Sequence, residues 1–172
     1  MKKFIVFLLV CFSLVASPSM AAQDQKVAFV DLQKALNLSS AGKAAKEKIK
    51  AEVQGYDAEV QQRQEELKKL KQDLEKQAML LSEEARSAKE RDYQQKVKEY
   101  QRFTKDIQET LQQTDADLTR KILERLLKVV QEVGKSGGYT IILEKTESSI
   151  VYADESIDIS DEVIKAFDAQ GK

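Results

Sequence analysis

Residues 41–133 form a long, highly charged stretch without a proline, and this feature limits the possible folds more than any other. The one proline of the chain is Pro18, so helices of unusual length are permitted after it. Mostly apolar residues recur at alternating spacings of four and three, which is the pattern of a left-handed coiled coil. These seam positions are Ile49, Val53, Tyr56, Val60, Arg63, Leu67, Leu70, Leu74, Gln77 and Leu81, followed by Tyr93, Val97, Tyr100, Thr104, Ile107, Leu111, Thr114 and Leu118. We therefore expect extended, solvated helices rather than one large core.

The heptad pattern is interrupted once, and the interruption predicts a reversal of the chain. Ser82 is a suitable N-cap for a second helix because acidic residues follow it directly. At 1.5 Å per residue, the outbound helix 41–80 would be about 60 Å long and the return helix 83–133 about 75 Å. We predict an antiparallel coiled-coil hairpin, an arm made of residues 41–118 with its tip near 79–84.

The return helix changes character at Leu118. The narrow seam before this residue suits one partner helix, whereas the apolar face after it is wide enough for a sheet or several partners. The wide face consists of Ile122, Leu123, Leu126, Leu127, Val129, Val130 and Val133. We expect the helix to leave the hairpin here, to enter a β-rich body made of residues 22–40 and 119–172, and to end at Gly134.

Three short apolar segments of the body predict strands, at residues 26–30, 139–143 and 150–153. A short helix capped by Asp31 and a terminal helix over residues 160–168 complete an α+β fold, with the hairpin inserted between the first two strands. The strands are apolar on both faces, and the chain's own helices can cover only one face. We therefore expect copies of the chain to associate through the sheet. The residues assigned to this association are Val27, Phe29, Ile141, Leu143 and Val151, with an ordinary intrachain core as the alternative.

The first 21 residues have the features of a cleavable signal peptide. Lys2 and Lys3 precede an apolar run of 12 residues, 4–15, which is too short to span a bilayer. Small residues at Ser19 and Ala21 then form a cleavage site. We expect a cut after Ala21 and a product exported to the periplasm.

The composition of the mature chain argues against an enzyme. The chain has no His, and its one Cys, Cys11, lies in the predicted signal peptide. Common catalytic triads, thiol chemistry and ordinary zinc sites are therefore excluded, and we expect no catalytic residue, cofactor or metal. Cleavage removes two of the 28 Lys and Arg residues against 29 Asp and Glu, which leaves a net charge of −3. A mildly acidic chain does not suit binding to nucleic acid.

The order of these parts resembles the Skp/OmpH family of periplasmic chaperones. The resemblance covers nearly the whole mature chain and depends on the segments 26–31, 139–143, 151–153 and 157–164 around a Gln/Lys/Glu-rich hairpin. It implies a homotrimer whose strands form a β-barrel-like trimerisation body, with three helical tentacles that enclose a cavity. It also implies a holdase that captures unfolded outer-membrane β-barrel proteins without ATP and keeps them soluble until they reach the outer-membrane assembly machinery.

The charge of the arm departs from one family pattern. Relatives that bind anionic lipid or lipopolysaccharide have strongly basic arms, whereas residues 63–100 here contain ten Lys or Arg and nine Asp or Glu. No lipopolysaccharide site can be placed on any residue by this resemblance, and the charge balance argues against lipid binding.

Client contact is expected at the exposed apolar residues of the arm. Ala78, Met79 and Leu80 lie at the tip, and Met adapts its shape to many partners. Phe103 lies off the seam and is a further candidate. The alternative role for the tip residues is ordinary closure of the hairpin.

A second function also fits the residues alone. A long coiled-coil arm on an associating body suits a structural spacer or adaptor of the cell envelope. A spacer would bind one folded partner tightly, whereas a holdase would suppress the aggregation of several unfolded membrane proteins.

Overall fold

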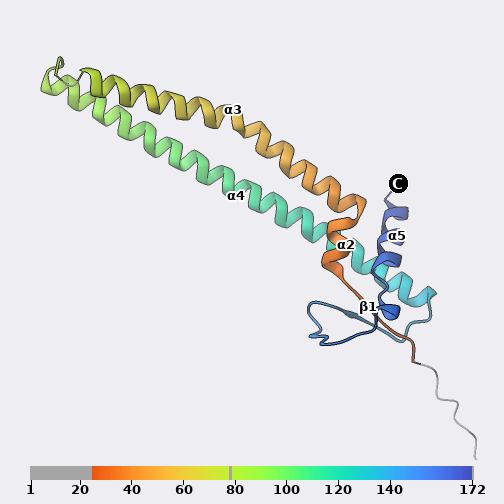
Figure 1. Ribbon diagram of the computed structural model, residues 1–172. Helices are drawn as coiled ribbons and strands as arrows, with labels where there is room; N and C mark the ends of the chain where they lie inside the picture. The colour runs from red at the N-terminus through yellow and green to blue at the C-terminus, as the bar shows by residue number, and fades with distance from the viewer. Residues whose placement is uncertain (1–24, 78, 172) are drawn as a thin grey trace, which may run out of the picture.

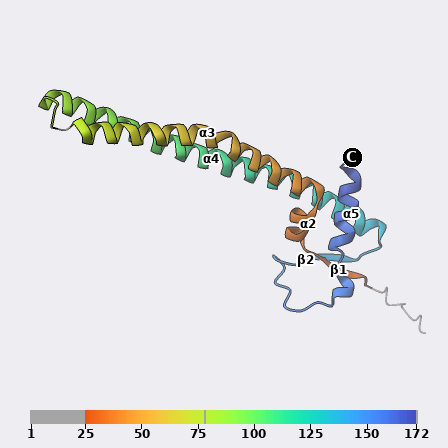
Figure 2. The same ribbon diagram turned by 45° about the horizontal axis from the view of Figure 1, so that its top comes forward.

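The computed structural model describes residues 25–77 and 79–171, and within them two long helices extend from a small body (Figure 1). The body combines the first and last segments of the described chain with the end of the second long helix (Figure 2). The predicted signal peptide and its cleavage site after Ala21 lie outside the described residues.

The two long helices are α3, Ser40–Gln77, and α4, Glu83–Ser136. They contain 38 and 54 residues, which corresponds to about 57 Å and about 81 Å at 1.5 Å per residue. Ser39 Oγ accepts a hydrogen bond from the Gly42 amide at 3.2 Å, and Ser82 Oγ accepts one from the Ala85 amide at 3.3 Å. Both helices therefore begin at serine caps that satisfy amides of their first turns.

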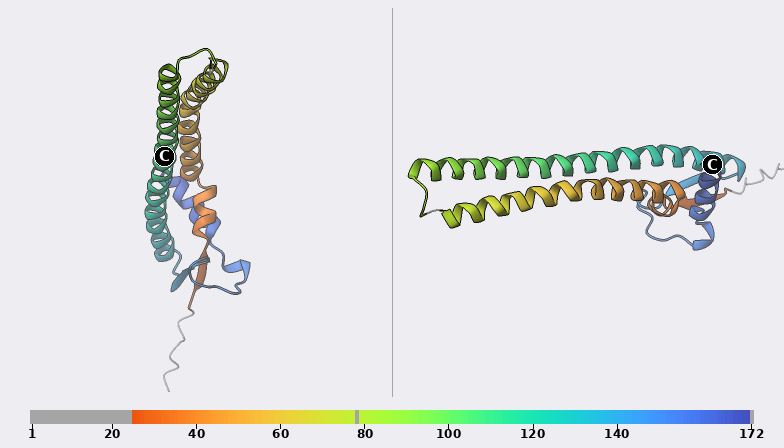
Figure 3. Two further views of the ribbon diagram at one scale, coloured as in Figure 1. Left: turned by 90° about the vertical axis from the view of Figure 1, so that its left-hand side faces the viewer. Right: turned by 90° about the horizontal axis from the view of Figure 1, so that it is seen from above.

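Helices α3 and α4 lie side by side along most of α3 and run in opposite directions (Figure 3). Gln64 Nε2 donates to Tyr100 Oη at 2.6 Å, and Lys89 Nζ donates to Gln77 Oε1 at 2.8 Å. Lys96 forms an ion pair with Glu66 at 3.2 Å. Polar side chains thus add two hydrogen bonds and an ion pair to the contact between the two helices.

The seam residues of the arm are only half-buried. Every predicted seam position on both helices has intermediate exposure except Val53, which is 40% exposed. Gly42, at the base of the arm, is the only fully buried residue of α3. The buried residues of α4 all lie beyond Leu118, where the sequence predicted a wide apolar face. The apolar core therefore occupies the body and does not extend along the arm.

The body contains a two-stranded parallel sheet and three shorter helices. Strands β1, Val27–Val30, and β2, Ile141–Glu144, pair with Val27 opposite Ile141. Helix α2, Leu32–Leu38, begins at an Asp31 cap, the short 3₁₀ helix η2 covers Glu155–Ile157, and α5 covers Ser160–Gln170. The predicted helices after Asp31 and from Ser160 are thus present.

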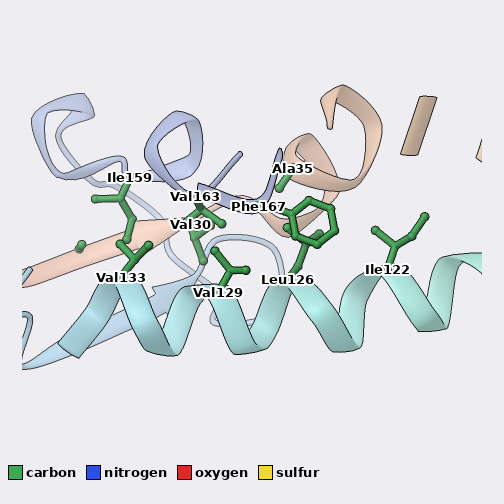
Figure 4. Packing of buried hydrophobic residues seen from close by; sticks show 10 residues of the cluster. Val30, Ala35, Ile122, Leu126, Val129, Val133, Ile159, Val163 and Phe167 are labelled. Atoms are coloured by element: carbon green, nitrogen blue, oxygen red, sulfur yellow. The ribbon is translucent and has the colours of Figure 1, made fainter. Parts of the chain in front are cut away.

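A stripe on one face of α4 forms the core together with β1, α2 and α5 (Figure 4). Leu126 and Val129 are at most 1% exposed, as are Val163 and Phe167 of α5, which pack against them. The remaining members of this cluster are Ala28, Val30, Ala35, Ile122, Val133 and Ile159. Burying a side chain of this kind contributes about 1.5–3 kcal/mol relative to leaving it exposed.

The predicted third strand, at residues 150–153, is not formed in the described structure. The second edge of β1 is occupied instead by Asp158, through an isolated bridge to Phe29, and the Ile159 amide donates to the Phe29 carbonyl at 3.0 Å. In the described structure residues 150–153 therefore do not pair with β1. With only two strands of four residues each, the body of a single chain is mainly helical.

The predicted end of the return helix at Gly134 was wrong, because α4 continues to Ser136. The left-handed residue is Gly138, with φ of 66°. The Gly138 amide donates to the Lys135 carbonyl at 3.4 Å, and the Tyr139 amide donates to the Gly134 carbonyl at 3.0 Å. These two hydrogen bonds are the pattern of a Schellman motif. Gly134 has a packing role instead, since a Cβ there would lie 3.1 Å from Ile142 Cδ1.

Candidate functional site

The face of the sheet that points away from the core is the first candidate site. Side chains alternate between the faces of a strand, so the buried Ala28 and Val30 assign the other β1 residues, Val27 and Phe29, to this outer face. The parallel register places Ile141 beside Val27 and Leu143 beside Phe29. Four of the five residues that the sequence assigned to association therefore share one face of the sheet.

These residues differ in how far the rest of the chain covers them. Val27 is 36% exposed and Ile141 is 47% exposed, whereas Phe29 is only 5% exposed. The Lys145 ammonium lies 5.8 Å from the centre of the Phe29 ring, and Asp158 forms a backbone bridge with Phe29. The outer face is thus apolar and open at Val27 and Ile141 and closed at Phe29.

Val151, the fifth residue assigned to association, lies in the segment between β2 and η2 and not on the sheet. It is fully exposed, and its neighbour Tyr152 is 84% exposed. Both residues border a hollow of about 550 Å³ that Phe29 and Lys145 also line. An exposed apolar segment therefore lies next to an apolar sheet face, which is typical of an interaction surface.

A polar cluster connects α2 and its cap to α5, and several of its residues line the same hollow. Lys34 forms an ion pair with Asp161 at 2.8 Å, and the Asp31 amide donates to the buried Ser160 hydroxyl at 2.8 Å. The hydrogen bond to Asp161 raises the pKa of Lys34. Burial acts to raise the pKa of Asp158, but hydrogen bonds from Ser160 and the charges of Lys34 and Lys145 outweigh it and hold this pKa below the ordinary value.

The lowered pKa of Asp158 predicts a loss of stability in acid. A carboxylate with a lower pKa in the folded state stabilises the fold above its unfolded pKa, about 3.9 for Asp, and loses this contribution as the pH falls through the folded pKa. We expect Asp158→Asn to lower the melting temperature at neutral pH and to have a much smaller effect below that window. Thermal melts across pH would measure this, and a constant difference at every pH would contradict it.

The tip of the arm is the second candidate site. Met79 is 98% exposed and Leu80 is 84% exposed, while Leu81 is half-buried on the seam. Ala78, the third predicted contact residue of the tip, lies outside the described residues. The tip thus presents two large apolar side chains to solvent.

Phe103 is not a free surface residue. The Arg63 guanidinium lies 4.2 Å from the centre of its ring, and Arg63 also forms an ion pair with Glu59 at 2.6 Å. Phe103 is half-buried as a result and takes part in the contact between α3 and α4. The heptad pattern did not predict this contact because Phe103 lies off the seam, and the long Arg63 side chain reaches its ring from the other helix.

The junction between arm and body contains three residues whose roles sequence reasoning missed. The Ser40 amide and hydroxyl donate to the two Asp168 carboxylate oxygens at 2.9 and 3.0 Å, so α5 holds the beginning of α3. A Cβ on Gly42 would lie 1.6 Å from the Leu36 carbonyl oxygen. The serine pair and glycine at the start of a long helix were the only local signal of this junction.

The described residues offer neither a metal-ion site nor a membrane-spanning helix. They contain no group of three or more His, Cys, Asp or Glu side chains arranged to hold a metal ion. Within the same residues, none of the helices combines the length and apolar character that a membrane span requires.

Comparison with known proteins places this architecture in a family. The family model described as outer membrane protein (OmpH-like) matches residues 26–167. The crystal structure of an OmpH-like outer membrane chaperone from Caulobacter crescentus CB15 is 21% identical, covers 85% of each chain and superimposes with a TM-score of 0.76, which shows a shared fold. A search of curated proteins gave no match. Because the family model spans both the arm and the body, the chain belongs to the OmpH-like outer membrane protein family.

Proposed function

We propose that the protein is an ATP-independent holdase of the periplasm that binds unfolded outer-membrane β-barrel proteins and prevents their aggregation. Its family membership supports a role with outer membrane proteins, and the similar Caulobacter crescentus protein is described as an outer membrane chaperone. The proposed client cavity lies between the arms of a homotrimer, and clients pass from it to the outer-membrane assembly machinery.

The observation that carries this proposal is the incompletely covered sheet. Within the described residues β2 pairs only with β1, so its other edge has free backbone groups. The neighbouring segment 150–153 has apolar residues and no strand partner. Pairing of this segment with the sheet of another copy would cover Ile141 and Val151 and would build a barrel-like trimerisation body from residues 22–40 and 119–172.

The arm, residues 41–118, has the properties that promiscuous binding requires. Its seam is half-buried, its charges are mixed, and its tip exposes Met79 and Leu80. Many weak contacts with one large client add up when several arms surround it, so tight binding at any one place is not needed. Cleavage after Ala21 would release the chain into the periplasm, where such clients pass.

A direct experiment dilutes a urea-unfolded outer-membrane barrel into buffer with and without the purified mature chain. A holdase should keep the barrel soluble, as measured by light scattering, near one oligomer per client and without ATP. It should act on several unrelated barrels. Aggregation that proceeds unchanged while the oligomer stays intact would contradict the proposal and favour an envelope spacer.

The oligomer itself can be tested at Ile141. We expect Ile141→Glu to reduce the light-scattering mass from three chains to one, because a charge would be buried on the outer face of the sheet. Val53→Glu is the matched control, since Val53 is 40% exposed but lies on the arm. An unchanged mass for Ile141→Glu, or dissociation by both variants, would contradict association through the sheet.

A further inference from the structure

Two stretches at the base of the arm carry a net positive charge, although the rest of the chain is net negative. Residues 40–50 and 118–128 together contain eight Lys or Arg and two Glu, although the whole chain has 28 basic and 29 acidic residues. The outer part of the arm, residues 63–100 including the tip, is nearly balanced, with ten basic and nine acidic residues. The positive charge is therefore a local property of the place where the arm joins the body.

A hollow of about 330 Å³ lies within this region, between α3 and α4. Its floor is apolar and consists of alanines of α3 together with Leu118 and Ile122 of α4. Three basic side chains stand around it: Lys48, Lys121 and Arg125. An apolar floor with a cationic rim complements a ligand that carries an apolar group next to an anion.

The rim cations are available for a ligand. Among the described residues, none of the three forms an ion pair, whereas the nearby Lys50 and Arg120 pair with acidic residues of their own helices. The Arg125 guanidinium lies 4.9 Å from the centre of the Phe167 ring. This contact holds the charge beside the hollow without neutralising it.

We infer that this hollow binds client segments in which an apolar side chain lies next to a carboxylate. The inference rests on the proposed holdase function and names the kind of segment that the base of the arm would recognise. Along α3 the hollow extends from Ala41 to Lys48, about 10 Å, which equals about three residues of an extended peptide. It is shorter than the hydrocarbon depth of one membrane leaflet, about 15 Å, and so suits a peptide better than a lipid acyl chain.

The test uses the mature chain and two short fluorescent peptides that differ only in Glu or Gln next to a phenylalanine. At low salt the Glu peptide should bind about tenfold more tightly, because three surface charge pairs each contribute modestly. The ratio should fall toward one at high salt, where exposed charges are screened. Equal binding of the two peptides by the wild-type chain would overturn the inference.

Three variants locate the effect. Lys48→Gln, Lys121→Gln and Arg125→Gln together should remove the preference for Glu, whereas the same change at the mid-arm residues Lys68, Lys69 and Lys71 should preserve it. Ala44 is exposed and lines the hollow, so a larger apolar side chain at this position would fill the hollow without changing the charge. Ala44→Phe should weaken the binding of both peptides, and a preference that survives the rim variant would overturn the inference.

Vesicles of anionic phospholipid and the holding assay separate the remaining outcomes. Vesicle binding that the rim variant loses, without discrimination between the peptides, would assign the hollow to lipid and overturn the inference. If the chain keeps unfolded barrels soluble but binds the Glu and Gln peptides equally, the inference about the hollow is overturned and the proposed holdase function stands. A preference for Glu without any holding would support the hollow as a peptide site and contradict the proposed holdase function.

Discussion

Gly42→Ala is expected to destabilise the protein by about 3 kcal/mol, since inserting a methyl into a closely packed site forces the backbone to move. The new Cβ would lie 1.6 Å from the Leu36 carbonyl oxygen, and this neighbour is backbone rather than a flexible side chain. The connection between α2 and α3 must therefore open, and it also contains the Ser39 cap and the Ser40 contact with Asp168. For a chain of this size the melting temperature should fall by about 10 °C.

Gly55→Ala is the matched control for this prediction. It makes the same chemical change in the same helix, but a Cβ at Gly55 would have no neighbour within 4 Å. Alanine is the better helix former, so this variant should gain up to about 1 kcal/mol. Similar losses in both variants, measured by circular dichroism on heating, would contradict the assigned packing role of Gly42.

Shortening the arm should abolish the holding of clients and leave the oligomer intact. The contacts of Gln64 with Tyr100 and of Glu66 with Lys96 show which residues of α3 and α4 lie opposite each other. Deleting residues 61–74 and 90–103 removes opposite segments that are each two heptads long, or about 21 Å. Whole heptads preserve the seam, so the tip and the base should join in register.

The shortened chain would be compared with the full chain in the barrel aggregation assay and by light-scattering mass. We expect an unchanged mass and little remaining protection, because the proposed cavity loses much of its depth. Changing Met79 and Leu80 to Ser in the full-length arm separates the contribution of the tip from that of length. Full protection by the shortened chain would contradict the cavity.

Local sequence signals were sufficient to predict the ends of several helices. The Asp31 and Ser82 caps each accept a hydrogen bond from an amide three residues later, so their effect does not depend on the rest of the fold. The cap of α3 is Ser39, whereas the neighbouring Ser40 hydroxyl donates to Asp168. The heptad pattern likewise predicted partial burial at the seam positions, with Val53 as the exception, but it did not predict the half-burial of the off-seam residue Phe103.

Contacts between distant parts of the chain could not be predicted in this way. Ser40 and Asp168 are 128 residues apart, and neither residue indicates its partner. The apolar segment 150–153 was expected to be a strand, but Asp158 occupies the second edge of β1 and, in the described residues, the segment pairs with neither strand. The four strand residues assigned to association share one face of the sheet because side chains alternate along each strand and the register places them side by side.

The confinement of complete burial to one end of the molecule has a further consequence. A segment with few buried contacts opens locally at a low free energy, whereas the core opens only when the whole domain unfolds. Amide hydrogen exchange should therefore be fastest toward Met79 and slowest at Leu126 and Phe167. Bending an arm around a bulky client would then cost little free energy, and the body that anchors the arm would keep its shape.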